Sequence, residues 1–227
     1  MKTITSLALQ AFVSNLLVGC VVGDNLTPVP DFPKSCAEIA TGDEDAKDGE
    51  YKLFVDADAT KPWKAYCDDM RGAATEYLTL PDGGDLNWST FLDAAGNEVR
   101  TRFDKVRIDP VTLKIDISDQ TFAMSTGSLT HNGTAVTSMP FGVAMSCGGG
   151  YASAQINVIR TPFVFVDKFD VGGATGASGN ANPWSTNQVV EMWADGNCAW
   201  IAPTAAPANP MNDAGDFLIE LTYQPQP

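Results

Sequence analysis

The sequence predicts a mainly β protein in which antiparallel sheets, with one or two short helices, are stapled by disulfides. Apolar and polar residues alternate over several short segments, which is the period of a half-buried strand. Glycine, proline, asparagine and aspartate interrupt these segments, as turns between strands require. Of the 227 residues, 44% are hydrophobic, 19% are charged and five are cysteines, so the chain can bury a core and close disulfides around it.

The chain opens with the features of an export signal. Lys2 is the one charged residue in 1–19, and an apolar run reaches residue 18. We therefore expect residues 1–19 to be a signal peptide. The run ends in Leu17-Val18-Gly19-Cys20, which resembles the lipobox of bacterial lipoproteins and makes Cys20 the candidate for lipidation.

A lipid on Cys20 would hold the protein at the outer surface or periplasmic face of a bacterial membrane. The alternative is an ordinary secretory signal cut near Gly19 or Gly23, after which the protein would be secreted. Residues 20–34 contain several prolines and predict an extended tether. The folded domain then spans 35–227.

The cysteine count agrees with a lipidated Cys20. Five is odd, and setting Cys20 aside leaves four cysteines that can pair completely in an oxidising compartment. Of the three connectivities, we favour Cys36–Cys67 with Cys147–Cys198, because each pair lies within one half of the chain. No two cysteines have zinc-ligand spacing, and the single histidine, His131, is distant from all of them in sequence, which argues against zinc.

The folded part is expected to begin with a brief helix. Ser35 can cap it, Glu38 stands three residues later, and Gly42 ends it. Strands are predicted where apolar residues alternate, at 51–55, 76–80, 154–166 (one or two strands) and 217–223. Residues 172–187 and 202–215 are rich in turn formers and small residues and predict long exposed loops.

The segment 98–119 predicts a β-hairpin. Residues 109–112 supply turn chemistry, and a two-residue tip would place Ile108 opposite Leu113. Apolar side chains fall on odd positions before Asp104 and on even positions after it. One buried face then requires an extra residue, so a β-bulge is predicted near Asp104.

Short motifs along the domain carry a family resemblance. They are Ser35-Cys36-Ala37-Glu38-Ile39, Asp48-Gly49-Glu50-Tyr51-Lys52-Leu53, Ala65-Tyr66-Cys67-Asp68-Asp69-Met70, Glu76-Tyr77-Leu78-Thr79-Leu80-Pro81, Asn87-Trp88-Ser89 and Arg102-Phe103-Asp104-Lys105-Val106-Arg107-Ile108-Asp109. In order, spacing and letters they are similar to the GON domain, the C-terminal module of ADAMTS-type metalloproteases. The likeness is strongest over 35–167.

The resemblance implies an extracellular accessory module of a protease. The chain lacks a His-Glu-x-x-His helix, so it does not carry that family's catalytic zinc site. The opening motifs also resemble the start of fibrinogen-like domains, in which the two cysteines are bonded. This resemblance implies Cys36–Cys67.

Candidate chemistry outside the cysteines is sparse. A net charge of -14 argues against nucleic acid as a partner. His131 lies in a turn-like stretch and is expected to be exposed rather than a catalytic base, so no catalytic residue is nominated. Clustered acids between residues 36 and 69 leave calcium open, although a solvated acidic face is favoured.

A basic stripe is the candidate ligand site, formed by Arg100, Arg102, Lys105 and Arg107 in an otherwise acidic chain. With the predicted bulge, all four lie on the polar face of one strand and could bind an anionic polysaccharide. The alternative is a charged strand face partly paired with Asp116. Trp184 offers a stacking surface for a sugar or a protein.

These features predict an exported cell-surface binding or adhesion module without catalytic activity, whose partner is an extracellular protein or glycan. Two alternatives stay open. One is a protease-associated domain that carries a metalloendopeptidase or zinc label by family association, and the other is a hydrolase that uses acidic residues.

Overall fold

The computed structural model describes residues 28–148, 150–166, 168–203 and 218–225. Over these ranges the chain is β-rich and mostly antiparallel, with one α-helix and two disulfides, so the predicted fold class is confirmed. The signal peptide, Cys20 and the tether up to residue 27 lie outside the described residues. So does most of the loop expected at 202–215.

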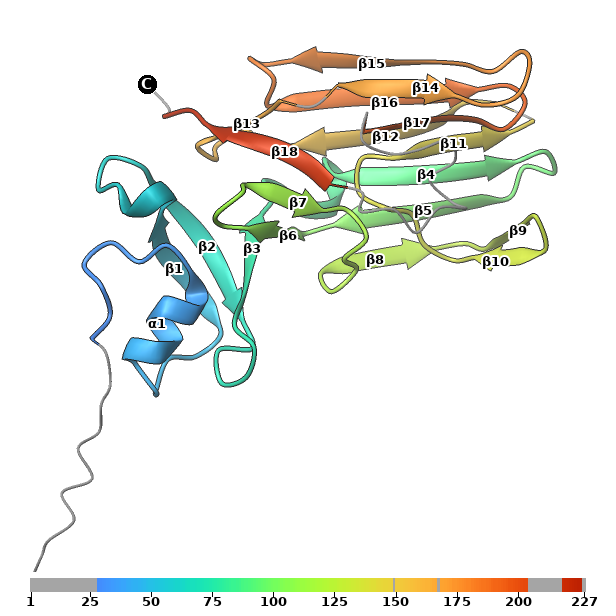
Figure 1. Cartoon of the computed structure of the whole chain (residues 1–227). Helices are drawn as coiled ribbons and strands as arrows, with labels where there is room; N and C mark the ends of the chain where they lie inside the picture. The colour runs from blue at the N-terminus through green and yellow to red at the C-terminus, as the bar shows by residue number, and fades with distance from the viewer. Residues whose placement is uncertain (1–27, 149, 167, 204–217, 226–227) are drawn as a thin grey trace, which may run out of the picture.

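The first sheet has seven strands in the order β1-β2-β3-β6-β7-β18-β13 (Figure 1). All of its pairings are antiparallel. The strands are β1 (Gly49–Phe54), β2 (Pro62–Asp68), β3 (Thr75–Thr79), β6 (Lys105–Asp109), β7 (Lys114–Asp116), β13 (Phe163–Phe165) and β18 (Leu218–Tyr223). A 3-10 turn, η1 (Val55–Ala57), joins β1 to β2.

The helix α1 (Cys36–Gly42) forms where the sequence predicts it. The Ser35 hydroxyl accepts a hydrogen bond from the Glu38 amide at 3.2 Å, and so satisfies one of the free amides of the first turn. Cys36 and Ile39 are its buried residues. Cys36 is bonded to Cys67 of β2, which fastens the helix to the first sheet.

The second sheet has nine strands. Its main path is β14-β17-β11-β4-β12-β16-β15, and β5 pairs with both β4 and β8. The strands are β4 (Trp88–Asp93), β5 (Glu98–Phe103), β8 (Ala123–Thr126), β11 (Ala144–Cys147), β12 (Ala152–Asn157), β14 (Phe169–Gly172), β15 (Ser178–Trp184), β16 (Val189–Asp195) and β17 (Ala199–Pro203). A turn η2 (Gly83–Asp85) precedes β4, and β9 (Leu129–His131) and β10 (Thr134–Val136) form a separate ribbon.

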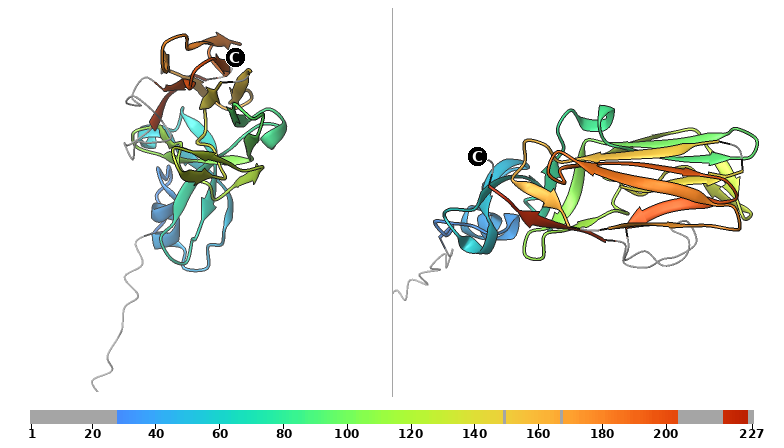
Figure 2. Two further views of the ribbon diagram at one scale, coloured as in Figure 1. Left: turned by 90° about the vertical axis from the view of Figure 1, so that its right-hand side faces the viewer. Right: turned by 90° about the horizontal axis from the view of Figure 1, so that it is seen from above.

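The second sheet branches at β4. Trp88 and Ser89 pair with β12, whereas Thr90 and the residues up to Asp93 pair with β11 in parallel. The strands β12, β16 and β15 form one branch, and β11, β17 and β14 form the other. Figure 2 shows the branches as stacked layers at the end of the molecule remote from α1.

The predicted bulge at Asp104 is wrong, because the chain changes sheets there. β5 ends at Phe103 in the second sheet, and β6 begins at Lys105 in the first. Asp104 links the two sheets: its amide donates to the Phe122 carbonyl at 3.0 Å and its carbonyl accepts from the Leu80 amide at 2.9 Å. The switch from odd to even apolar positions therefore marks the passage from a strand of one sheet to a strand of the other.

The β6–β7 hairpin forms, with a different register. Ile108 lies opposite Ile115 and not opposite Leu113, so the loop has four residues instead of two. The Asp109 carboxylate accepts hydrogen bonds from the Val111 and Thr112 amides, both at 2.8 Å, which stabilises the longer turn.

The loop predicted at 172–187 is also wrong in part. The strand β15 occupies Ser178–Trp184 and pairs with β16 along seven residues. Its exposed edge position explains the composition, since small and polar residues and Pro183 are tolerated where only one side is paired.

Both sheets contribute to one buried core. Its largest fully buried side chains include Phe91 and Phe103 of the second sheet and Phe163 of the first, and Phe103 packs edge-on against Phe141 at 5.1 Å between ring centroids. In the described ranges, no helix has the length and apolar content needed to cross a membrane.

Candidate functional site

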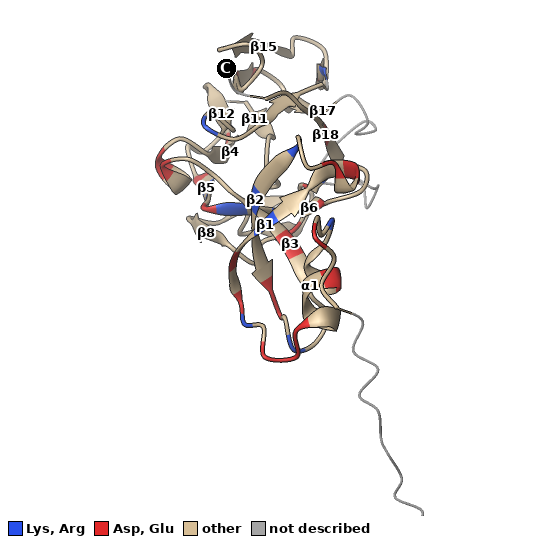
Figure 3. Cartoon of the chain, turned by 90° about the vertical axis from the view of Figure 1, so that its left-hand side faces the viewer, with Lys and Arg blue, Asp and Glu red and all other residues tan. Residues whose placement is uncertain are grey.

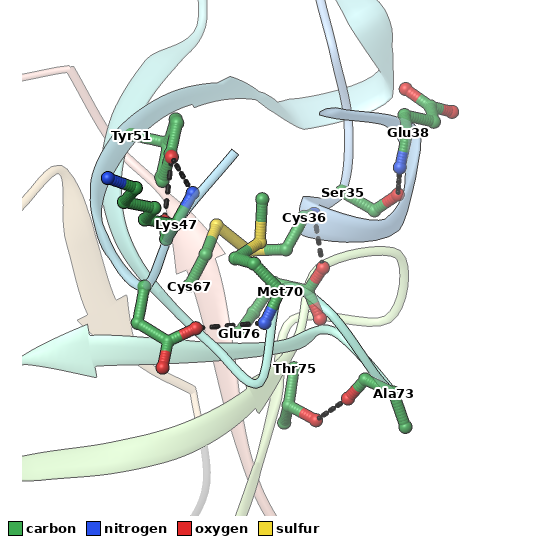
Figure 4. Close-up of a disulfide and its surroundings, with 11 residues drawn as sticks. Ser35, Cys36, Glu38, Lys47, Tyr51, Cys67, Met70, Ala73, Thr75 and Glu76 are labelled. Atoms are coloured by element: carbon green, nitrogen blue, oxygen red, sulfur yellow. Dashed lines mark hydrogen bonds between the residues drawn. A yellow bond between two sulfur atoms is a disulfide. The ribbon is translucent and has the colours of Figure 1, made fainter. Parts of the chain in front are cut away.

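The surroundings of the Cys36–Cys67 disulfide give it a structural role (Figure 4). Both cysteines are fully buried. The Cys36 amide donates to Glu76 Oε1 at 2.6 Å, so a carboxylate stands at the N-terminus of α1. Burial raises the pKa of Glu76 above its ordinary value, against the opposing effect of that hydrogen bond. The buried carboxylate is explained by its contact with the helix.

The second favoured disulfide, Cys147–Cys198, is also present and lies beside His131. The Nδ1 atom of His131 is 3.8 Å from Cys147 Sγ, and its Nε2 is 3.1 Å from the Asn132 amide nitrogen. His131 is only 8% exposed, so the expected exposed turn residue is wrong. The reason is tertiary, because the ring packs edge-on against Phe91 at 5.2 Å between centroids.

The electrostatic state of His131 follows from this burial. Removal from water disfavours the charged imidazolium and lowers the pKa of His131. The imidazole is then neutral near neutral pH, the state in which a histidine nitrogen can accept a proton or bind a metal ion.

The predicted basic stripe is divided between the two sheets. Arg100 and Arg102 belong to β5. The Arg100 guanidinium lies over the Trp88 ring at 4.8 Å, and Arg102 Nη1 is 3.7 Å from Asp85 Oδ1. Both cations therefore have partners within the fold.

Lys105 and Arg107 belong to β6 in the first sheet. Lys105 Nζ lies 4.6 Å from the ring centroids of both Tyr66 and Phe122, a cation-π arrangement. Arg107 is exposed and lies opposite Asp116, the residue expected to pair with part of the stripe.

Trp184 is exposed, as predicted, with 46% of its surface accessible. It ends β15, an edge strand, and the strands β16, β12 and β4 separate β15 from β5. Trp184 and the arginines of β5 therefore do not form one site.

A second group of cations lies at the edge of the first sheet. Lys52 of β1 and Lys64 of β2 are directly opposite each other, and Arg160 approaches them from the loop before β13. Figure 3 views this region, with basic segments of β1, β2 and β6 in blue. Together they line an open groove of about 500 Å³, here called the basic groove, with Glu50, Tyr51, Pro62, Trp63 and Pro162.

The basic groove has an excess of positive charge. Lys64 Nζ is 3.5 Å from Glu50 Oε2, and Arg160 Nη2 is 3.8 Å from Asp82 Oδ2. Among the described residues, no ion pair is found for Lys52. Like charges directly opposite each other across strands repel, so the Lys52–Lys64 pairing favours an anion between or above them.

The lining of the basic groove is largely apolar apart from these charges. Pro62 and Pro162 supply rigid apolar surface, whereas Tyr51 and Trp63, which also line it, alternate with the lysines and pack toward the core. Trp63 is only 3% exposed, and its Nε1 donor is buried without an acceptor among the described residues. A buried donor of this kind is unusual in folded proteins.

Sequence reasoning missed the basic groove, although part of its signal was present. The alternation that buries Leu53 places Lys52 on the opposite face of β1. The pairing of Lys52 with Lys64 and the approach of Arg160 depend on register and on a loop far away in the sequence, which no local pattern reports.

The acidic residues considered for calcium are spread over separate loops. Asp56 and Asp58 both lie within 4 Å of Lys61 Nζ, at 3.4 and 3.8 Å. The Asp69 carboxylate accepts the Ala73 amide at 2.9 Å. Across the described ranges, the ligating side chains that converge are instead His131, Cys147 and Cys198, whose donor atoms lie within 4.8 Å of one another.

The fold and the two cystines define the class of disulfide-stapled β modules, which is compatible with an extracellular or exported protein. Within this class, residues 33–100 match the family model of the GON domain, which confirms the resemblance over these residues. The match runs from just before α1 into β5 and is compatible with an extracellular or exported protein. Neither curated proteins nor solved structures gave a significant match.

Proposed function

We propose that the chain is an exported cell-surface binding module that recognises an anionic extracellular glycan through the basic groove and has no catalytic activity of its own. The observation that carries this proposal is the groove itself, where Lys52, Lys64 and Arg160 surround an apolar lining in a chain of net charge -14. The GON match supports the extracellular setting.

The chemistry of the lining favours a charged sugar over other anions. Carboxylate or sulfate groups can form charge-assisted hydrogen bonds with the lysines and with Arg160. The apolar faces of sugar rings can pack on Pro62 and Pro162, as ligands do in largely apolar clefts. An acidic glycan combines both properties in one repeating chain.

The outer face of the first sheet extends the proposed surface. By register, Lys52 and Lys64 share a face with Tyr66, Tyr77 and Arg107, and on this face Phe122 packs edge-on against both tyrosine rings and Tyr77 is buried. Lys105 stands on the same face, opposite Thr79. Of the predicted stripe, Lys105 and Arg107 thus stay candidates for ligand contact, whereas Arg100, Arg102 and Trp184 are assigned no part in it.

The binding proposal predicts a specific loss on charge reversal. The double variant K52E/K64E should bind acidic polysaccharides at least about tenfold more weakly than the parent protein, equivalent to about 1.4 kcal/mol. Parent binding should also weaken as salt is raised, because the contacts are ionic and exposed. Binding is measured on an array of uronate-containing, sulfated and neutral glycans, followed by titration calorimetry.

The matched control is K34E/K47E, which makes the same change in net charge on two lysines that do not line the groove. It should keep the parent affinity. Equal weakening of binding in both variants would mean that net charge, and not the groove, determines the affinity. Unchanged binding by K52E/K64E would overturn the proposed site.

We propose further that Cys20 carries a lipid that anchors the module to a membrane. The support is the apolar leader ending in Leu17-Val18-Gly19-Cys20 and the even number of cysteines left without Cys20. The mass of the intact native protein should equal residues 20–227 with two cystines and an added acylglyceryl group. A mass with no acyl group on a chain that starts elsewhere would refute the anchor and leave a secreted protein.

A further inference from the structure

His131, Cys147 and Cys198 are brought together from three separate parts of the second half of the chain. His131 ends β9, Cys147 ends β11, and Cys198 lies between β16 and β17. Their donor atoms all lie within 4.8 Å of one another. Nothing in the proposed glycan binding uses this cluster.

The two cystines differ in accessibility. Cys36 and Cys67 are both fully buried, whereas Cys147 and Cys198 are partly exposed. Thiol–disulfide exchange requires an attacking thiolate to reach a sulfur atom. A reductant in solution can therefore reach the second cystine while the first stays protected by the fold.

The distances fit a shared metal ion once the sulfur–sulfur bond is open. Bond lengths of about 2.3 Å for zinc–sulfur and 2.0 Å for zinc–nitrogen put the donor atoms of a tetrahedral site about 3.5 Å apart for nitrogen and sulfur. His131 Nδ1 and Cys147 Sγ are 3.8 Å apart. The histidine and one sulfur are thus already near the spacing that coordination requires.

We propose that Cys147, Cys198 and His131 form a redox-gated site for a thiophilic cation of the zinc class. In the oxidised state the cystine is closed. An external dithiol transfers two electrons and two protons, giving two cysteine thiols and a disulfide on the reductant. Binding of the divalent ion then displaces the two thiol protons, and the ion is held by two thiolates, His131 Nδ1 and a water molecule.

The surroundings of His131 support this assignment. Metal binding through Nδ1 places the remaining ring proton on Nε2, which faces the Asn132 side-chain amide at 3.1 Å. A turn of that amide presents its oxygen as the acceptor, an outer partner of the kind that fixes metal-binding histidines.

The first test is selective reduction of the folded protein. The protein is treated without air with a phosphine reductant, desalted and alkylated, and the labelled peptides are mapped. We expect label on Cys147 and Cys198 and an intact Cys36–Cys67 cystine, with the β-sheet circular dichroism retained. Reduction of both cystines together with loss of the β signal would overturn the proposal.

The second test is metal binding by the desalted, reduced protein. Cobalt(II) should bind with a stoichiometry of one and give thiolate-to-metal charge-transfer and tetrahedral visible bands, and zinc(II) should displace it. The oxidised protein is the control and should show neither band. Absence of these bands in the reduced protein would refute the site.

Two variants separate a metal site from a pair of free thiols. H131N should weaken cobalt binding by at least about tenfold, because losing even an outer partner of a metal ligand typically costs about 10- to 100-fold in affinity. C198S cannot form the cystine, so it should bind cobalt without prior reduction. Its affinity should be lower than that of the reduced parent protein, because one thiolate ligand is missing. Parent-like affinity in both variants would overturn the assignment, and C198S keeps the test decisive where H131N does not fold.

Discussion

At the scale of single residues, Glu76 shows how burial changes a charged group. Its carboxylate is 8% exposed and accepts the Cys36 amide at 2.6 Å. Burial raises its pKa above 4.5, its ordinary value. Because the folded pKa exceeds the unfolded one, the unfolded state ionises first as pH rises. The contribution of Glu76 to stability is therefore present below about pH 4.5 and falls as pH rises through the folded pKa.

This pH dependence predicts different stabilities for two Glu76 variants. E76Q keeps an acceptor without a charge, so its free energy of unfolding should fall less between pH 4 and pH 7 than that of the parent protein. E76L removes the acceptor, leaves a buried amide unpaired and should lose about 1 to 3 kcal/mol. Urea unfolding across that pH range measures both. An E76L protein as stable as the parent would contradict the role of Glu76 at the helix N-terminus.

For His131 the contribution to stability changes with pH in the opposite direction. Burial lowers the pKa of this base, so the unfolded state takes up a proton first as pH falls. The contribution of neutral His131 is present above the ordinary value of 6.5 and is lost as pH decreases below it. Burial thus sets the direction of the pKa shift of both Glu76 and His131. Neither burial follows from the neighbouring residues in the sequence.

At the scale of elements, the β6–β7 hairpin shows what turn chemistry fixes. Residues 109–112 were correctly identified as a turn, but the tip length was wrong. Asp109 accepts two amides at 2.8 Å in a four-residue loop. This local network, chiefly the hydrogen bond from Thr112, holds the pKa of Asp109 below its ordinary value.

The hairpin predicts a pH-dependent difference between two Asp109 variants. D109A should lose about 1 kcal/mol at neutral pH, a modest value because the turn is exposed to solvent. D109N keeps an acceptor and should lose less. Since the folded pKa is depressed, the advantage of the parent over D109A should shrink as pH falls below about 3.8. Urea midpoints at neutral and acid pH measure this, and a constant difference at all pH values would contradict it.

At Asp104 the hydrophobic periodicity correctly locates an irregularity in the chain but does not identify its kind. The phase change at this residue is real, and a bulge in one strand or a transfer between two sheets both produce it. The transfer is decided by partners distant in sequence, since Leu80 and Phe122 bond the Asp104 backbone. The basic stripe was divided for the same reason.

At the scale of the whole molecule, two cystines fix the two ends of the fold. They close separations of 31 and 51 residues, for which loop entropy gives about 4 kcal/mol each. That is a large share of the stability of a typical domain. The first cystine holds α1 on the first sheet, and the second ties β11 to the β16–β17 connection in the second sheet.

The whole fold also explains why the candidate sites could not be read from the sequence. The proposed basic groove combines strands β1 and β2 with Arg160, about a hundred residues further along the chain. The cluster of His131 with Cys147 and Cys198 has no zinc-ligand spacing, and sequence distance was the argument against it. Spacing rules detect sites carried on one short element, whereas these two sites are assembled by sheet topology.

The sequence by itself determined the β-rich class, the capped helix at Ser35, the favoured cystine pairs and the GON resemblance. These features depend on local periodicity, on capping and turn chemistry, and on short motifs, all of which are written in neighbouring residues. Only the tertiary structure decided the strand register, the change of sheets at Asp104, the burial of His131 and the membership of the basic groove. Each of these depends on contacts between segments far apart in the chain, and it is the packing of the two sheets on one core that selects them.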